Sequence, residues 1–121
     1  MAILHAVSGE PVSVLPPANA LGERQTVALF KTNGLEVMRV ALQKGKSMPP
    51  HKVAGDITVQ CLEGSIRFNS DGNEQVMVAG DMLYLDGGIL HSLTAIEDAC
   101  ALVHRVAQIN TPCYSAQFAP G

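Results

Sequence analysis

Short apolar runs alternate with turn residues along the chain, and no segment keeps a helical period of apolar positions. The strongest turn signal is Asn33-Gly34, which separates two apolar runs and predicts a β-hairpin. The runs that we expect to be strands cover residues 25–32, 35–43, 57–63, 65–69, 74–78, 82–85, 89–96 and 99–109. About eight short strands in 121 residues predict an all-β sandwich or barrel.

Alternation within the strands predicts which side chains face the interior. Ile57, Val59 and Cys61 share one face of their strand. In the last strand, Leu102 and His104 share an apolar face, so we expect His104 to point into the interior.

The chain is expected to form one domain with two extensions. Residues 1–24 are rich in proline, which favours extended backbone without a full set of hydrogen-bond donors, so they predict an edge strand or an arm. Residues 25–110 hold the expected strands and form the barrel, and residues 111–121 form a C-terminal tail. Apolar residues make up 47% of the chain and charged residues 16%, which suits a packed core.

Charge and hydropathy exclude several classes of function. A net charge of -3 lacks the basic surface that nucleic-acid or anionic-membrane binding needs, so neither partner is expected. No apolar run is long enough for a membrane span, and the N-terminus does not resemble a secretory signal. The odd number of cysteines (Cys61, Cys100 and Cys113) predicts reduced thiols and therefore a cytoplasmic location.

Two segments, 45–64 and 80–95, carry a spacing pattern of glycine and histidine. Here the sequence resembles the cupin superfamily, whose two motifs place glycines and histidines at fixed intervals. The residues that stand at the required spacings are Gly45, His51, Gly64, Gly80, Gly88 and His91. The resemblance implies a small single-domain cupin of the RmlC-like type, a double-stranded β-helix or jelly-roll barrel with a small central pocket.

The metal-binding motif of the family is degenerate in this chain. Metal-binding cupins use two histidines and a glutamate from the first motif and one histidine from the second. Here Val53 stands at the second histidine position and Ile57 at the glutamate position. The resemblance therefore leaves His51 and His91 as metal-ligand candidates, an incomplete set.

A divalent Zn, Fe, Mn or Ni ion normally takes three or more protein ligands, so a metal site requires a third. His104 is one candidate, if it faces the interior; its alternative role is that of a core histidine hydrogen-bonded to a neighbour. Asp56 is the other: a regular strand sends it to the opposite face from Ile57, and a bulge at Ala54-Gly55 would turn it inward.

We expect a mostly apolar pocket centred on His51 and His91, and no catalytic residue is assigned. Its expected lining is His51, Val53, Ile57, Val59, Phe68, Tyr84, His91, Leu93 and His104. The first hypothesis is a small-molecule-binding cupin whose metal site is degraded or absent, with the two histidines as polar anchors and a ligand that the sequence does not name.

The second hypothesis is a cupin enzyme of the dioxygenase, isomerase or decarboxylase type, acting on a small organic acid, ketone or sugar. With a third ligand it would be metal-dependent; without metal, a histidine would serve as general base and Tyr84 as the acid. A domain that mainly mediates dimerisation is a third hypothesis, which the retained histidine pair disfavours. By family analogy, and because exposed sheet edges invite pairing, a symmetric homodimer is expected.

Overall fold

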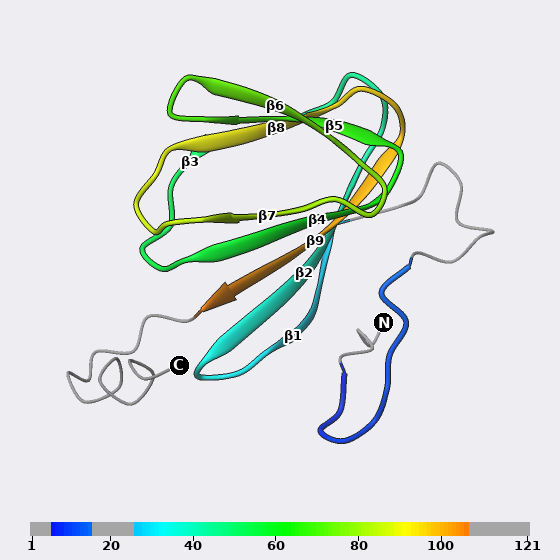
Figure 1. Ribbon diagram of the computed structural model, residues 1–121. Coiled ribbons are helices and arrows are strands. Elements are labelled where there is room, and N and C mark those ends of the chain that lie inside the picture. Colours follow the sequence, from blue (N-terminus) through cyan, green and yellow to red (C-terminus); the bar gives the residue numbers. More distant parts are fainter. Residues whose placement is uncertain (1–5, 16–25, 107–121) are drawn as a thin grey trace.

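The computed structural model describes residues 6–15 and 26–106, which contain nine β-strands and no helix. The strands form two antiparallel sheets that face each other (Figure 1). The five-stranded sheet has the order β1 (Val27–Lys31), β2 (Leu35–Leu42), β9 (Ala99–Val106), β4 (Ile57–Glu63) and β7 (Met82–Leu85). The four-stranded sheet has the order β3 (Ser47–His51), β8 (His91–Ala95), β5 (Ser65–Ser70) and β6 (Asn73–Val78). The all-β jelly-roll fold expected from the sequence is confirmed.

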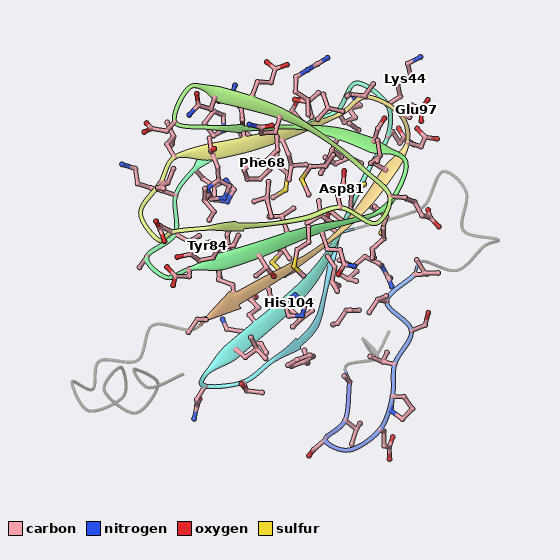
Figure 2. The ribbon with its side chains drawn as sticks, viewed as in Figure 1. Lys44, Phe68, Asp81, Tyr84, Glu97 and His104 are labelled. Carbon is pink, nitrogen blue, oxygen red and sulfur yellow. The ribbon has the colours of Figure 1, made fainter. Side chains whose placement is uncertain are left out.

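The space between the sheets holds the main core. Ile57, Val59 and Cys61 face it from β4, as their alternation predicts, and each is at most 4% exposed. From the opposite sheet, Ile66 and Phe68 of β5 face the same core. Figure 2 shows Phe68 between the two sheets. β4 and β5 therefore bury alternate residues, as packing on one face requires.

The assignment of faces on β9 is wrong in the sequence analysis. Ala101 and Val103 are paired with Cys61 and Val59 of β4 and pack in the main core, so the odd-numbered residues of β9 face inward. His104 consequently lies on the outer face, and Figure 2 shows it projecting away from the four-stranded sheet. Leu102 shares that outer face, where it packs with Leu29 and other apolar side chains in a second cluster.

The second apolar cluster explains why the alternation of apolar residues on β9 gave the wrong interior face. Leu29, Val37 and Leu102 are each at most 6% exposed on the outer face of β1, β2 and β9. Val14 of the N-terminal segment packs against them, and the backbone N–H of Ala6 donates to the Leu29 carbonyl at 2.8 Å. A sheet covered on both faces has apolar residues at both parities, so hydrophobicity alone does not identify the interior.

Residues 6–15 form no strand, and they contact the five-stranded sheet through hydrogen bonds of Ala6 with Leu29 and of Leu15 with Arg39. The rest of the edge strand or arm expected for residues 1–24 and the tail expected at 111–121 lie outside the described residues. No helix among the described residues is long and apolar enough to cross a membrane.

Candidate functional site

A cavity of about 120 Å³ opens between the two sheets and is lined by β2, β3, β4, β5, β8, β9 and the segment after β3. Its lining is Met38, Val40, Met48, His51, Val53, Ile57, Val59, Phe68, His91, Leu93, Val103 and Arg105. Nine of these twelve side chains are aliphatic, thioether or phenyl groups, so polar chemistry in the cavity is confined to two imidazoles and one guanidinium. Of the nine residues that the sequence predicts for the pocket, seven lie here and two, Tyr84 and His104, do not.

His51 and His91 lie side by side in this cavity. They end β3 and begin β8, respectively, and their backbones are paired across those strands. The ring centroids are 4.4 Å apart, with 54° between the ring planes. His91 is 6% exposed, whereas His51 lies at the exposed end of its strand. The pairing of β3 with β8 therefore brings together two histidines that are forty positions apart in the sequence.

Both imidazoles are anchored in the same way. Nδ1 of His51 lies 3.1 Å from the Pro49 carbonyl oxygen, and Nδ1 of His91 lies 2.9 Å from the Ile89 carbonyl oxygen. A carbonyl oxygen can only accept, so each Nδ1 carries a proton and donates it. In a neutral imidazole this leaves the lone pair on Nε2, which is then available to accept a hydrogen bond, take a proton or bind a cation.

Phe68 fixes the face of the buried imidazole. Its ring stacks on that of His91 with centroids 5.8 Å apart and 14° between the planes. Phe68 is only 1% exposed, so the main core holds it rigidly. The phenyl ring thus restricts the His91 ring to one orientation in the cavity.

The two candidates for a third metal ligand both point elsewhere. His104 is on the outer face of the sheet, so its predicted place in the pocket is wrong. Asp56 is exposed, and its Oδ1 accepts a hydrogen bond from the Gly87 N–H at 3.0 Å, which ties the chain before β4 to the loop after β7. Asp56 therefore has a structural partner outside the cavity.

Tyr84 was expected in the pocket as an acid opposite a histidine, and this is wrong. It lies on the outer face of β7, paired with Thr58, and is 61% exposed. Its hydroxyl donates to Oδ1 of Asp86, and this hydrogen bond, with smaller effects of desolvation and of the Asp56 and Asp86 charges, raises the pKa of Tyr84 to about 12. A phenol that holds its proton this strongly, outside the cavity, cannot serve the histidines as an acid.

Sequence analysis missed the charged group of the cavity. Arg105 faces inward from β9, next to Val103, and its Nη2 lies 2.6 Å from Oε1 of Glu36 on β2. The two residues are paired across β2 and β9, and their side chains are 39% and 13% exposed, respectively. The sequence contains one acidic and one basic residue on these two strands. Their pairing, and the inward direction of Arg105, are known only from the register of β9 against β2.

Arg105 and Val53 also line a second, more open space of about 350 Å³, which we call the outer compartment. The rest of its lining is Lys31, Glu36, Ala54, Gly55 and Val106. Because the two spaces share Arg105 and Val53, the outer compartment adjoins the cavity at these two residues.

The family model for the cupin domain matches residues 38–105, which include both histidines and all twelve residues that line the cavity. This chain belongs to the cupin family. No curated protein matches the chain.

Solved cupin structures share its fold at low sequence identity. A cupin superfamily protein from Desulfitobacterium hafniense is 16% identical with a TM-score of 0.69, over 82% of this chain and all (100%) of that one. A conserved protein of unknown function from Streptococcus pyogenes is 21% identical with a TM-score of 0.67, over 85% of this chain and 99% of that one. An RmlC-like cupin from Shewanella frigidimarina is 18% identical with a TM-score of 0.65, over 70% of this chain and 77% of that one. Identities this low establish the fold alone.

Many cupins hold a divalent metal, and the donors of this cavity do not fit one. Among the described residues, no group of three or more His, Cys, Asp and Glu side chains could hold a metal ion. Val53 and Ile57, which the sequence resemblance matches to metal-ligand positions of the family, line the cavity, and neither side chain has a lone pair to donate. The guanidinium of Arg105 places a positive charge in the same lining, which opposes a second cation.

Proposed function

We propose that this cupin binds a small, largely apolar molecule in the cavity between its sheets, without a resident divalent metal, and that its role is sensing or sequestration rather than turnover. One observation carries the proposal: two neighbouring imidazoles, with ring centroids 4.4 Å apart, lie in a cavity whose other lining residues, apart from Arg105, are apolar. Such a site combines apolar walls that favour transfer of a ligand from water with a few polar groups that orient it.

The size of the cavity limits the ligand. A dry apolar cavity of about 150 Å³ is large enough for benzene. At about 120 Å³ this cavity suits a branched alkyl group or a small ring rather than a polyol or a nucleotide. A sugar would also leave several hydroxyls facing aliphatic walls without partners, which is costly.

The Nε2 atoms supply the directional contact. Because both Nδ1 atoms are committed to backbone carbonyls, the neutral rings present acceptors to a ligand N–H or O–H. The same feature favours a second candidate function, metal-free isomerase chemistry, in which one Nε2 takes a proton from the ligand. That candidate needs a proton donor, a role for which Tyr84 is excluded by its position.

Two measurements test the proposal. Elemental analysis of the chain purified without added metal should give well under one divalent ion per chain. A stoichiometric Zn, Fe, Mn or Ni ion that is lost in His91→Ala would overturn the metal-free site.

The second measurement is a thermal-shift screen of small branched acids, amides, alcohols and aromatics on the wild-type chain. Compounds that raise its melting temperature should raise it less in His51→Ala, which alters an exposed residue and should fold normally. His104→Ala is the matched control, because that imidazole is on the outer face, and it should respond like the wild type. Equal losses in both variants would contradict binding at the histidine pair.

We further propose that the protein acts as a homodimer in a reducing compartment such as the cytoplasm. The buried Cys61 supports the second point: its Sγ lies 3.4 Å from the Glu63 carbonyl oxygen, and burial, followed by the nearby Asp81 charge, raises the pKa of the thiol. A protonated, buried thiol is an inert packing group rather than a partner for a disulfide.

A further inference from the structure

A row of charged residues crosses the five-stranded sheet beside the cavity. Lys31 of β1 is paired with Glu36 of β2, and Glu36 is paired with Arg105 of β9. These strands are neighbours at one side of the sheet (Figure 1). All three residues line the outer compartment, and Arg105 lines the cavity as well. The entrance to the apolar cavity therefore carries two cationic groups and one carboxylate.

The guanidinium of Arg105 retains unused hydrogen-bonding capacity. It has five N–H donors, and its recorded partner among residues 6–15 and 26–106 is Oε1 of Glu36, which Nη2 contacts at 2.6 Å. The single carboxylate of Glu36 cannot accept from all five N–H donors of Arg105 and also neutralise the charge of Lys31. Among the described residues that line the outer compartment, two cations face one carboxylate, which leaves an excess of one positive charge.

We infer that the ligand is a small monocarboxylate, whose carboxylate binds Arg105 and whose compact, largely apolar body fills the cavity, where a hydroxyl or N–H group of that body can donate to an Nε2 atom. This inference rests on the proposed function and names its class of ligand. A carboxylate matches the planar donor fork of an arginine, and charge-assisted hydrogen bonds are about twice as strong as neutral ones. Arg105 lines both the cavity and the outer compartment, and its side chain is 39% exposed, so this residue is placed to contact both the apolar body and the carboxylate of such a molecule.

Glu36 sets the strength of this contact. Its side chain is 13% exposed, and it holds the guanidinium in place before the ligand arrives. It also repels an incoming carboxylate, so the affinity reflects a competition between Glu36 and the ligand for the same donors. Removal of Glu36 should therefore strengthen binding of the acid, whereas removal of Arg105 should weaken it.

The test compares an acid with its amide, which has the same shape and no charge. The probes are 3-methylbutanoate and 3-methylbutanamide, titrated into the full chain at low ionic strength and followed by amide chemical shifts in ¹H–¹⁵N NMR spectra. In the wild type we expect the acid to bind about tenfold more tightly than the amide. This ratio corresponds to the low end of the free energy of a hydrogen bond to a charged group, because the Arg105 side chain is partly exposed. Arg105→Gln should reduce that ratio to about one, and Glu36→Gln should increase it.

The matched control is Arg67→Gln. Arg67 is also a strand arginine in an ion pair, with its Nε 2.7 Å from Oε2 of Glu74, but it lies on the exposed face of β5 away from the cavity. Its removal changes the net charge by the same amount and should leave the acid-to-amide ratio as in the wild type. Equal effects of the two arginine variants would show non-specific attraction and overturn the inference.

Failure of the inference and failure of the proposed function give different results. If acid and amide bind equally well and both shift the signals of cavity residues, the ligand class is wrong and the proposed function stands. If neither probe, nor benzoate and benzamide as a second pair, shifts any cavity signal, both are overturned. Should Arg105→Gln fail to fold, the rise in the ratio expected for Glu36→Gln decides, and an unchanged or lower ratio there contradicts the inference.

Discussion

Single hydrogen bonds determine what each ionisable side chain near the cavity can do. His51 and His91 keep Nε2 available because backbone carbonyls hold Nδ1. Asp56 lies outside the cavity and accepts a hydrogen bond from the Gly87 N–H, and Tyr84 donates a hydrogen bond to Asp86 on the outer face. Residue type alone did not distinguish these cases, since all four residues are plausible ligands or acids in the sequence.

At this scale we predict the titration of Tyr84. Its pKa is raised to about 12 from 10.0, so the neutral phenol is favoured in the folded state, and this contribution to stability is present below pH 10 and lost as the pH rises from 10 to 12. The ¹³Cζ NMR signal of Tyr84 should therefore shift near pH 12, and Asp86→Asn should return the transition toward pH 10. Tyr84→Phe identifies the signal against that of Tyr114, the other tyrosine of the chain. An identical midpoint in Asp86→Asn would contradict the assigned cause.

Among the elements, the turns connect the two sheets and so position the cavity strands. Gly64 lies between β4 and β5, one on each sheet, with a φ of 72°. A Cβ at this position would collide with the backbone of Asp98 and Ala99 just before and at the start of β9. Gly64 is thus required both for its left-handed backbone and for close approach of a neighbouring chain segment.

Substitution of Gly64 should be much more damaging than that of another glycine with positive φ. Gly72 has a φ of 86°, and nothing lies within 4 Å of a Cβ placed there. Gly72→Ala should lower the free energy of unfolding by about 1–2 kcal/mol, the cost of the left-handed conformation. Gly64→Ala adds a backbone collision and should lower it by about 3–5 kcal/mol. Urea denaturation measures both, and equal losses would rule out the close contact.

β3 is the element that the sequence analysis missed. Its five residues, Ser47–His51, include Pro49 and Pro50, which lack the N–H groups of a regular strand. The structure pairs Ser47, Met48 and His51 with β8, with an irregularity between Met48 and His51. β3 is at the edge of its sheet, where missing donors are tolerated. This irregular edge strand places His51 directly opposite His91 on β8.

For the whole molecule, the exposed edge of the five-stranded sheet is where a second copy of the chain is expected to associate. β7 is one of its edges, and it exposes Met82 (60%) and Tyr84 (61%) on the outer face. Adjacent apolar side chains on an edge strand favour association.

We therefore keep the prediction of a symmetric homodimer. Light scattering coupled to size exclusion should give a mass of about twice that of the chain, and Met82→Lys should lower the dimer fraction by placing a charge on this edge. Val76→Lys is the matched control, since Val76 is 58% exposed on β6 of the other sheet. A monomeric mass for the wild-type chain contradicts the prediction.

The sequence determined the strands with one-sided alternation, the Asn33-Gly34 hairpin between β1 and β2, the cupin fold, and the meeting of His51 with His91 in a mostly apolar cavity. These follow from local turn chemistry and from motif spacing, both of which are written along the chain. Only the tertiary structure decided the interior face of β9, which replaced His104 by Arg105 in the cavity wall. The reason is that the N-terminal arm and the second apolar cluster bury the outer face too, so that the direction of a side chain there depends on strand register and not on hydrophobicity.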